Sequence, residues 1–325
     1  MPSVNIIKYW SYPDILRQTK GESGKWDGID FFVNSSKPSD YIVVHGHTKG
    51  PVLVRCNPRN IWIVTGEPPN EARRHWHTPP RWAAKLLMTD VELVGGKRKL
   101  GQSLLPWWVD KSFDDLAEMS PTVKTGNLCW ITSNSVALEG HRYRMRYLDR
   151  IRTMPDLHLY GRGFRPVVGK WESLASYRYS IAFENHSNSM YFSEKLMDCF
   201  LAWTMPIYFG CSDLSKFFPR ESFVQLDPEN PEPIAVLKRI IESDMREKHF
   251  EAIVEARRRV LYDYNLFNLL AMEVRENERQ SPSSTRSRQP CLLWDHTSGW
   301  RQLKPPFLNG LKDRILDAIS SVRRY

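Results

Sequence analysis

The sequence predicts an α/β protein built from two domains that face a cleft. The first observation is length, because 325 residues exceed one ordinary core and a domain usually holds about 150 residues. The second is a series of short apolar, β-branched runs between polar segments, which is typical of buried parallel strands. The third is that helical patterns lie between several of these runs, as at residues 143–152 and 196–203, which favours βαβ units.

The apolar runs fall into two sets. We expect strands of the first set at residues 4–7, 31–33, 41–44 and 61–64, and strands of the second set at residues 128–132, 157–160, 179–183, 206–209 and 222–226. A polar passage with Pro and Gly, residues 112–126, separates the two sets. We therefore assign residues 1–120 to a first domain and residues 121–278 to a second.

Residues 279–325 differ in composition from both domains. The stretch QSPSSTRSRQP, residues 280–290, has few apolar side chains and predicts a flexible linker. Beyond it, apolar residues recur at helical spacing between basic ones and predict an amphipathic helix, namely Leu311, Ile315, Ala318, Ile319 and Val322. Two uses of this helix stay open, which are packing on the first domain and lying on an anionic membrane surface.

Composition and charge narrow the class of protein. With 41% hydrophobic and 26% charged residues, the chain has the balance of a soluble globular protein. A net charge of +9 suits nucleic acid, an anionic membrane or a phosphorylated small molecule, and charge alone does not choose among them. The five cysteines form no CxxC pair, which indicates reduced thiols. Because no signal-peptide pattern and no run of about 18 apolar residues occurs, we expect a cytoplasmic, bacterial protein.

Residues 177–210 carry the most informative pattern. The strand at 179–183 ends in the polar loop ENHSNSMYF, and Ser193 then caps a helix. In an α/β sheet, ligands collect at the carboxyl ends of strands, and a helix N-terminus offers free N–H groups to an anion. In that first turn, Lys195 supplies a positive charge for a phosphate and Glu194 accepts hydrogen bonds from a ribose or sugar diol.

This pattern resembles the donor-binding motif of the α1,3-fucosyltransferase family. FEN, then Tyr191 six residues after Asn185, then Ser-Glu-Lys, a helix and a strand that starts at Pro206 agree in spacing. The resemblance extends over about residues 127–270 through SNS at 133–135, LYGRG at 159–163 and FFPRESFVQLD at 217–227. It implies an inverting enzyme that uses GDP-fucose and has two Rossmann-like domains facing a cleft, the GT-B type.

The resemblance also implies roles for individual residues. Asn185, Tyr191, Glu194 and Lys195 take the positions of donor-binding residues. The arginine that holds the donor diphosphate corresponds to Arg144, with Arg142 as its competitor, and we expect Lys195 and Arg144 to be exposed cations that pair with phosphates. Further members of the motif are Ser133, Asn134 and Glu184, of which Glu184 has a structural alternative, fixing the loop through backbone N–H groups.

Inversion requires a carboxylate that removes the proton of the acceptor hydroxyl. We expect this base at the end of a strand of the first domain, where Glu67 follows the strand at 61–64. The family has a proposed base at a corresponding strand end, but Pro68 departs from its pattern. Glu71 and Asp90 are alternative candidates for the base. Glu67 also has a structural alternative, which is to cap a turn or a helix.

The first domain is expected to bind the acceptor. Its tryptophans are candidates for stacking on a sugar, although we expect at least two of them in the core, among Trp76, Trp82, Trp107 and Trp108. His75 and His77 have a spacing that suits a metal, but no acidic partner stands near them, so we predict no metal site.

The function implied is transfer of fucose from GDP-fucose to a glycan hydroxyl, with inversion and in α1,3 linkage, in glycan biosynthesis or protein glycosylation. The expected partners are the nucleotide-sugar donor, a glycan acceptor and the inner face of an anionic membrane, with no nucleic acid and no obligatory cofactor. Two alternatives stay open. One is a related transferase with another nucleotide-sugar donor, and the other is a non-enzymatic nucleic-acid-binding protein, suggested by the +9 charge and the basic runs 97–99 and 257–259.

Overall fold

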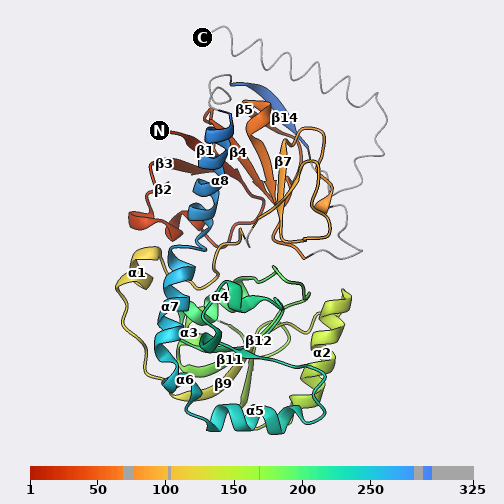
Figure 1. Ribbon diagram of the computed structural model, residues 1–325, viewed down its shortest axis with the longest axis vertical. Coiled ribbons are helices and arrows are strands. Elements are labelled where there is room, and N and C mark those ends of the chain that lie inside the picture. Colours follow the sequence, from red (N-terminus) through yellow and green to blue (C-terminus); the bar gives the residue numbers. More distant parts are fainter. Residues whose placement is uncertain (69–75, 102–103, 168, 282–287, 295–325) are drawn as a thin grey trace.

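A computed structural model describes residues 1–68, 76–101, 104–167, 169–281 and 288–294 of the chain. Two α/β units, each built on a mainly parallel sheet, lie one above the other in Figure 1. We call the unit with the N-terminal sheet the first unit and the other the second unit. The predicted α/β class with two Rossmann-like units is confirmed.

The first unit is built on a seven-stranded sheet. Its strand order is β2-β3-β1-β4-β6-β7-β8, and every pair is parallel except β2 with β3. β4 and β6 are buried along their whole length, as central strands covered on both faces are. The strands are β1 (Ser3–Ile7), β2 (Lys25–Trp26), β3 (Ile29–Val33), β4 (Tyr41–His45), β6 (Ile61–Val64), β7 (Lys85–Met88) and β8 (Arg98–Leu100).

Distant parts of the chain cover this sheet. Among the described residues up to β8, the connections are loops and 3-10 turns without an α-helix, whereas the helical patterns predicted at residues 143–152 and 196–203 both belong to the second unit. One reason is length, since residues 34–40 alone join β3 to β4. Helix α8 (Leu266–Gln280) packs its apolar stripe on one face, and the antiparallel ribbon of β5 (Val52–Cys56) and β14 (Gln289–Leu293) packs on the other.

The second unit has the regular alternation that the sequence predicts. Its five parallel strands have the order β10-β9-β11-β12-β13. They are β9 (Gly126–Ile131), β10 (Leu157–Tyr160), β11 (Tyr177–Phe183), β12 (Met205–Phe209) and β13 (Val224–Gln225). Because this sheet is buried on both faces, its strands are nearly continuous in apolar residues.

Helices cover both faces of the second sheet. α2 (Glu139–Ile151) and α5 (Pro233–Glu242) pack on one face. The other face carries α1 (Phe113–Glu118), α3 (Lys170–Ala175), α4 (Glu194–Leu201) and α7 (Phe250–Leu261), while α6 (Met245–Lys248) leads into α7. In Figure 1, α7 continues upward into α8, which carries the chain back to the first unit.

The packing divides the chain differently from the assigned domains. Trp107 and Phe113 already belong to the core of the second unit, whereas α8 belongs to that of the first. The last two residues of the predicted linker, 289 and 290, belong to β14. Leu293 of the same strand is buried against the first unit. The amphipathic helix expected at residues 311–324 lies outside the described residues.

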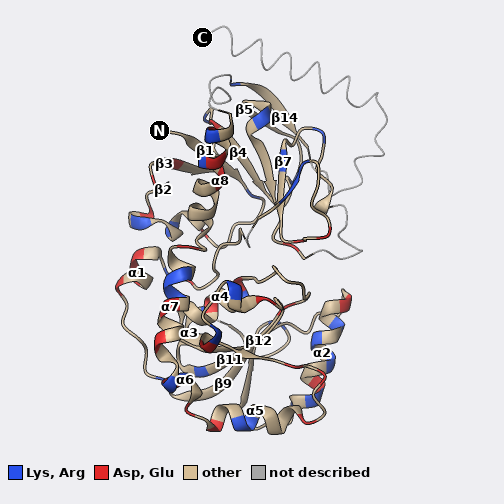
Figure 2. Cartoon of the chain, in the orientation of Figure 1, with Lys and Arg blue, Asp and Glu red and all other residues tan. Residues whose placement is uncertain are grey.

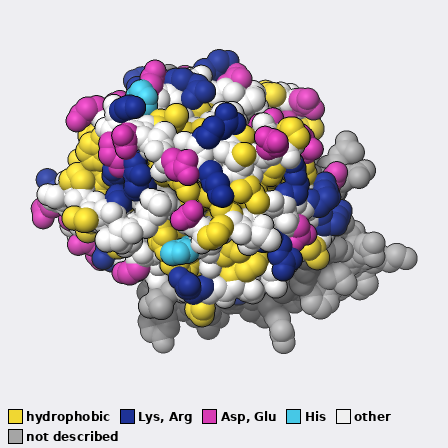
Figure 3. All heavy atoms as spheres, turned by 90° about the horizontal axis from the view of Figure 1, so that it is seen from below, with side chains coloured by type: hydrophobic (Ala, Val, Ile, Leu, Met, Phe, Trp, Pro, Cys, Tyr) yellow, Lys and Arg dark blue, Asp and Glu magenta, His cyan; other side chains and the backbone are white. Residues whose placement is uncertain are grey.

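Charges of both signs are spread over the two units. Figure 2 shows Lys and Arg mixed with Asp and Glu on the helices of the second unit. The face seen in Figure 3 likewise carries basic, acidic and apolar side chains side by side. Over the described part of the chain, no helix combines the length and the apolarity that a membrane span requires.

Candidate functional site

A cavity of about 540 Å³ lies between the two units. Its upper wall comes from the carboxyl ends of β1, β4 and β6, and its lower wall from those of β9 and β11 and from the start of α4. β1 lies between β3 and β4, and β9 lies between β10 and β11, so each wall includes the point where strand order reverses. Open α/β sheets bind ligands at such points. Two Rossmann-like units that face each other across this cavity form the GT-B arrangement.

Glu184 anchors the loop that enters α4. Its carboxylate has no exposed surface and accepts hydrogen bonds from the Ser193 backbone N–H at 2.8 Å and from the Ser193 hydroxyl at 2.7 Å. The ammonium of Lys195 donates to it at 3.0 Å. Ser193 in turn caps α4 by accepting from the backbone N–H of Lys195. Glu184 thus lies beneath the cavity rather than on its lining.

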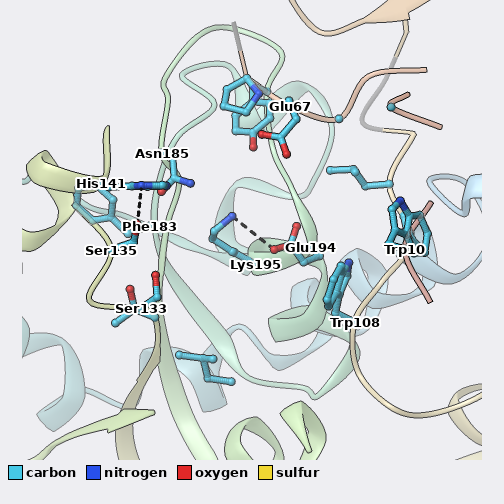
Figure 4. A pocket seen from close by; sticks show the side chains of 18 of the residues that line it. Trp10, Glu67, Trp108, Ser133, Ser135, His141, Phe183, Asn185, Glu194 and Lys195 are labelled. Carbon is cyan, nitrogen blue, oxygen red and sulfur yellow. Dashed lines mark hydrogen bonds and ion pairs between the residues drawn. The ribbon is translucent and has the colours of Figure 1, made fainter. Parts of the chain in front are cut away.

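Glu194 and Lys195 stand side by side on the cavity floor (Figure 4). Their charged atoms are 3.5 Å apart, and their side chains are 22% and 23% exposed. Burial alone would raise the pKa of Glu194, but the charges of Lys195 and Lys170 lower it to about 2. Burial opposes the charge of Lys195 as well, yet Glu184 and Glu194 raise its pKa above the usual range. Both groups are therefore ionised at neutral pH.

Arg144 lines the cavity, and Arg142 does not. From α2, Arg144 donates to the Asn185 side-chain oxygen at 2.8 Å and to the Ser133 hydroxyl at 3.1 Å. The expectation that Arg144 is exposed is wrong, since only 4% of its surface is accessible. Burial lowers its pKa, and Glu184 opposes this effect. Arg142 is exposed and donates to the carbonyl of Val136.

The loop between β11 and α4 brings Asn185 and Tyr191 to the cavity. Asn188 shapes it, because its side-chain oxygen accepts from the backbone N–H groups of Met190 at 2.8 Å and Tyr191 at 2.6 Å. A side chain at Gly140 would place its Cβ 1.8 Å from the Asn185 carbonyl, so this glycine allows α2 to approach the loop.

The two motif residues that precede α2, Ser133 and Asn134, differ in their position relative to the cavity. Ser133 lines it. Asn134 is outside the lining, and its backbone N–H donates to the carbonyl of Arg162. The structure thus gathers Ser133, Arg144, Asn185, Tyr191, Glu194 and Lys195 around one cavity, and leaves Asn134, Arg142 and Glu184 outside its lining.

Glu67 lies on the opposite wall, just after β6. Figure 4 shows its carboxylate pointing into the cavity, toward the side where Glu194 and Lys195 lie. Asp90 is outside the cavity lining, and its carboxylate accepts from the backbone N–H of Glu92 at 2.9 Å. Glu71 lies outside the described residues.

Two further cations, Arg162 and Lys170, line the cavity and are not among the predicted site residues. Arg162 belongs to the LYGRG motif, so the motif itself contained a signal for it. Lys170 has no such signal. It opens a short helix, and only the fold brings its ammonium to within 2.8 Å of the Asp198 carboxylate.

The predicted tryptophans divide between cavity and core. Trp76 and Trp108 line the cavity, as does Trp10, which is not one of the four predicted tryptophans. Trp107 is a core residue with 2% of its surface exposed. Trp82 is half-buried and packs near Trp294, with ring centres 6.4 Å apart.

The described residues contain no group of three or more His, Cys, Asp or Glu side chains that would hold a metal ion. His77 is buried, and His75 lies outside the described residues. Burial lowers the pKa of His45, whose ring Nε2 lies 2.8 Å from the Leu104 carbonyl at the cavity wall.

Comparison with protein families gives a match that covers most of the second unit. Residues 121–251 match the family model described as Glycosyltransferase family 10 (fucosyltransferase) C-term. Human 4-galactosyl-N-acetylglucosaminide 3-alpha-L-fucosyltransferase 9 is 26% identical over 126 residues, which cover 37% of this chain and 34% of that protein. Mouse alpha-(1,3)-fucosyltransferase 4 is 32% identical over 111 residues, 32% of this chain and 25% of that protein. The match thus spans about a third or less of these relatives.

Solved structures of similar architecture include glycosyltransferases. A crystal structure of α1,3-fucosyltransferase with GDP-fucose aligns with 79% of this chain and 81% of that one, at a TM-score of 0.43 and 18% identity. A mutant of S. aureus TarM, in a complex that includes UDP, aligns with 72% of this chain and 55% of that one, at a TM-score of 0.46 and 7% identity. The resemblance drawn from the sequence motifs is confirmed by the family model, which identifies residues 121–251 as similar to the C-terminal domain of glycosyltransferase family 10, the fucosyltransferase family.

Proposed function

We propose that the chain transfers fucose from GDP-fucose to a hydroxyl of a glycan acceptor, with inversion and in α1,3 linkage. One observation carries the proposal: a single cavity unites Asn185, Glu194 and Lys195 of the family domain with the carboxylate of Glu67 from the other unit. Inverting transfer needs these two parts, a cationic holder for the leaving group and a base across from it.

The lower wall suits a nucleotide diphosphate. Lys195, Arg162 and Arg144 supply positive charge, and a diphosphate gains negative charge as the sugar leaves it. Glu194, ionised by its neighbouring lysines, accepts hydrogen bonds from a ribose or sugar diol. Arg144 would act partly by holding Asn185 in place, since its guanidinium already donates to that side chain.

The upper wall supplies the base and the acceptor surface. Glu67 would take the proton of the acceptor hydroxyl as that oxygen bonds to the anomeric carbon. The bond from this carbon to the diphosphate oxygen breaks on the opposite face, so GDP leaves and the configuration inverts. Trp10, Trp76 and Trp108 offer indole faces to a pyranose ring. The human relative's name specifies a 4-galactosyl-N-acetylglucosaminide acceptor, and we propose this class as the first to test.

The decisive experiment presents the protein with a panel of GDP- and UDP-sugars, each with and without Gal-β1,4-GlcNAc. We expect release of GDP from GDP-fucose, stimulated by the acceptor, and an NMR-defined α1,3 product. Preference for another nucleotide sugar would show that GDP-fucose is not the donor. Thermal stabilisation by an oligonucleotide instead of GDP, falling steeply with salt, would favour the nucleic-acid alternative.

We further propose that transfer needs no divalent ion, because side-chain cations already line the wall where the diphosphate would lie. Turnover should persist in excess EDTA. Loss of turnover in EDTA that returns with Mg²⁺ or Mn²⁺ would contradict this.

We also propose a bacterial, cytoplasmic enzyme that touches the inner face of an anionic membrane. The support is the amphipathic pattern with basic flanks at residues 311–324. The full chain should bind vesicles that contain phosphatidylglycerol more tightly than the chain truncated after Trp294. Equal binding of both chains would count against the membrane contact.

A further inference from the structure

A buried ion pair lies at the floor of the cavity. The Lys170 ammonium, at the start of α3, is 2.8 Å from the Asp198 carboxylate in α4, and their side chains are 21% and 2% exposed. Lys170 lines the cavity, whereas Asp198 lies behind it. The proposed reaction assigns no step to either residue. A charge as deeply buried as Asp198 needs partners that offset its loss of hydration.

Asp198 finds further partners in the connecting segment between the units, residues 104–112. One of its oxygens accepts from the backbone N–H groups of Trp108 at 2.8 Å and Val109 at 3.3 Å. The Trp108 side chain lines the cavity, and the Lys170 ammonium lies 5.6 Å from the centre of its ring. One carboxylate therefore fixes both the backbone of Trp108 and the ammonium of Lys170.

The same pair adjoins the donor-binding residues. Glu194 and Asp198 are four positions apart on α4, so they lie on the same side of the helix. A small cavity of about 20 Å³ is lined by Lys170, Lys195 and Asp198, which places these three charged side chains around one point. The charges alternate in sign from Asp198 through Lys170 and Glu194 to Lys195.

The pKa shifts of Lys170 and Asp198 agree with this alternation of charges. Burial would lower the pKa of Lys170, but Asp198 and Glu194 raise it above its usual value. Burial raises the pKa of Asp198, and Lys170 opposes that rise. The other titratable or charged groups around the pair are Lys195 and Cys199 of α4, Asp110 of the connecting segment and Tyr12 of the first unit.

We propose that the Lys170–Asp198 pair is a positioning device that holds Glu194 in its ionised, donor-binding state and ties the donor site to the connecting segment through Trp108. This inference rests on the proposed function, because it takes a GDP-sugar as the occupant of the floor. Lys170 keeps a positive charge beside Glu194, and Asp198 keeps Lys170 there. Without the pair, Glu194 loses one of the two cations that favour its charged form.

The test compares variants by GDP affinity at two pH values. Lys170→Gln combined with Asp198→Asn removes both charges and leaves neither one buried alone. Lys170→Arg keeps the charge. The control is Lys85→Gln with Glu273→Gln, which breaks another partly buried pair at 2.9 Å, in the first unit between β7 and α8. The dissociation constant of GDP is measured by calorimetry at pH 7.5 and pH 5.

We expect the double variant at the site to bind GDP about tenfold more weakly at pH 7.5, the effect of one lost charge-assisted interaction. Between pH 7.5 and pH 5 its affinity should fall by more than that of the wild type, because the titration of Glu194 moves upward toward pH 5. The affinity of the wild type itself changes over this range, because the terminal phosphate of GDP takes up a proton at about pH 6. Lys170→Arg and the control pair should keep both the affinity and this pH response of the wild type. If the double variant does not fold, Lys170→Gln alone still donates to Asp198 and is expected to show the pH response of the double variant.

Wild-type affinity and pH response in the site variants would overturn the proposal. So would an equal loss in the control pair, which would indicate general destabilisation. Failure of the wild-type chain to bind GDP at all would instead refute the proposed function, and this inference with it. The wild-type measurement therefore separates the two failures.

Discussion

Arg142 and Arg144 show how strongly a single position on a helix decides the role of a residue. They are two positions apart on α2, a rotation of about 200°, so their side chains leave opposite sides of the helix. Arg144 is buried against Asn185 and Ser133, and Arg142 is exposed. The two arginines are thus a matched pair for experiment.

We expect Arg144→Ala to weaken GDP binding by about 10- to 100-fold, because a charge-assisted contact and the support of Asn185 are lost together. The same change should cost about 1–3 kcal/mol of unfolding free energy, since polar partners lose their hydrogen bonds in a buried place. Arg142→Ala should change neither the affinity for GDP nor the free energy of unfolding. Calorimetric titration with GDP and urea unfolding measure both effects. Equal GDP affinity in the two variants would remove Arg144 from the donor site.

Glu67 is the residue on which the chemical step depends in our proposal. Glu67→Gln should leave GDP affinity nearly unchanged and lower turnover by about 10²–10⁴-fold, which is the usual contribution of a general base. Asp90→Asn is the control, because Asp90 follows a neighbouring strand but does not line the cavity. Turnover is measured as GDP release in the presence of the acceptor. Near-normal turnover in Glu67→Gln would assign the base to another residue.

At the scale of elements, the first turn of α4 carries two charged side chains, Glu194 and Lys195, that are largely buried. Glu194 has a pKa of about 2 in the folded chain against an ordinary value of 4.5. A carboxyl group whose pKa is lowered by folding stabilises the fold above its ordinary pKa, and this stabilisation is lost as pH falls from about 4.5 toward 2. The first turn of α4 should therefore be sensitive to acid.

We expect the free energy of unfolding to fall between pH 5 and pH 2, with a contribution from Glu194 of up to about 3 kcal/mol. Glu194→Gln should flatten this part of the profile, and Glu251→Gln, at an exposed position of α7, should not. Urea unfolding at several pH values measures the difference. Identical profiles for wild type and Glu194→Gln would show that the carboxyl group is not stabilised in its charged form.

At the scale of the whole molecule, the chain returns from the second unit to complete the first. α8 supplies Phe267 and Leu270 to the core of the first unit, and β14 adds Leu293, which has no exposed surface, to the opposite face. β14 pairs with β5 along its whole length in antiparallel register. The first unit therefore depends on residues far from it in sequence.

Two truncations isolate the contribution of β14. A chain that ends after Ser281 should be less stable than one that ends after Trp294 by about 2–4 kcal/mol, since it loses a buried leucine and a row of strand hydrogen bonds. Both chains lack residues 295–325, so their difference reports only the segment with β14. Denaturant unfolding provides the measurement. Equal stability would mean that this strand adds nothing to the first unit.

The sequence alone determined the second unit and most of its site. The regular spacing of apolar runs and helical patterns predicted β9 to β13, and the ENHSNSMYF loop predicted where a ligand would bind. These features are local, since a strand, a loop and a helix N-cap follow one another within about 20 residues. The placement of Asn185, Glu194 and Lys195 together therefore needed no distant contact.

Only the tertiary structure decided the rest, because it depends on contacts between residues far apart in the chain. Local sequence does not show that α8 and β14 cover the first sheet, since their apolar residues suit many partners. The burial of Arg144 and the pairing of Lys170 with Asp198 likewise arise where separate elements meet. The opposition of Glu67 to the floor residues is set by how the two units face each other, which no local pattern records.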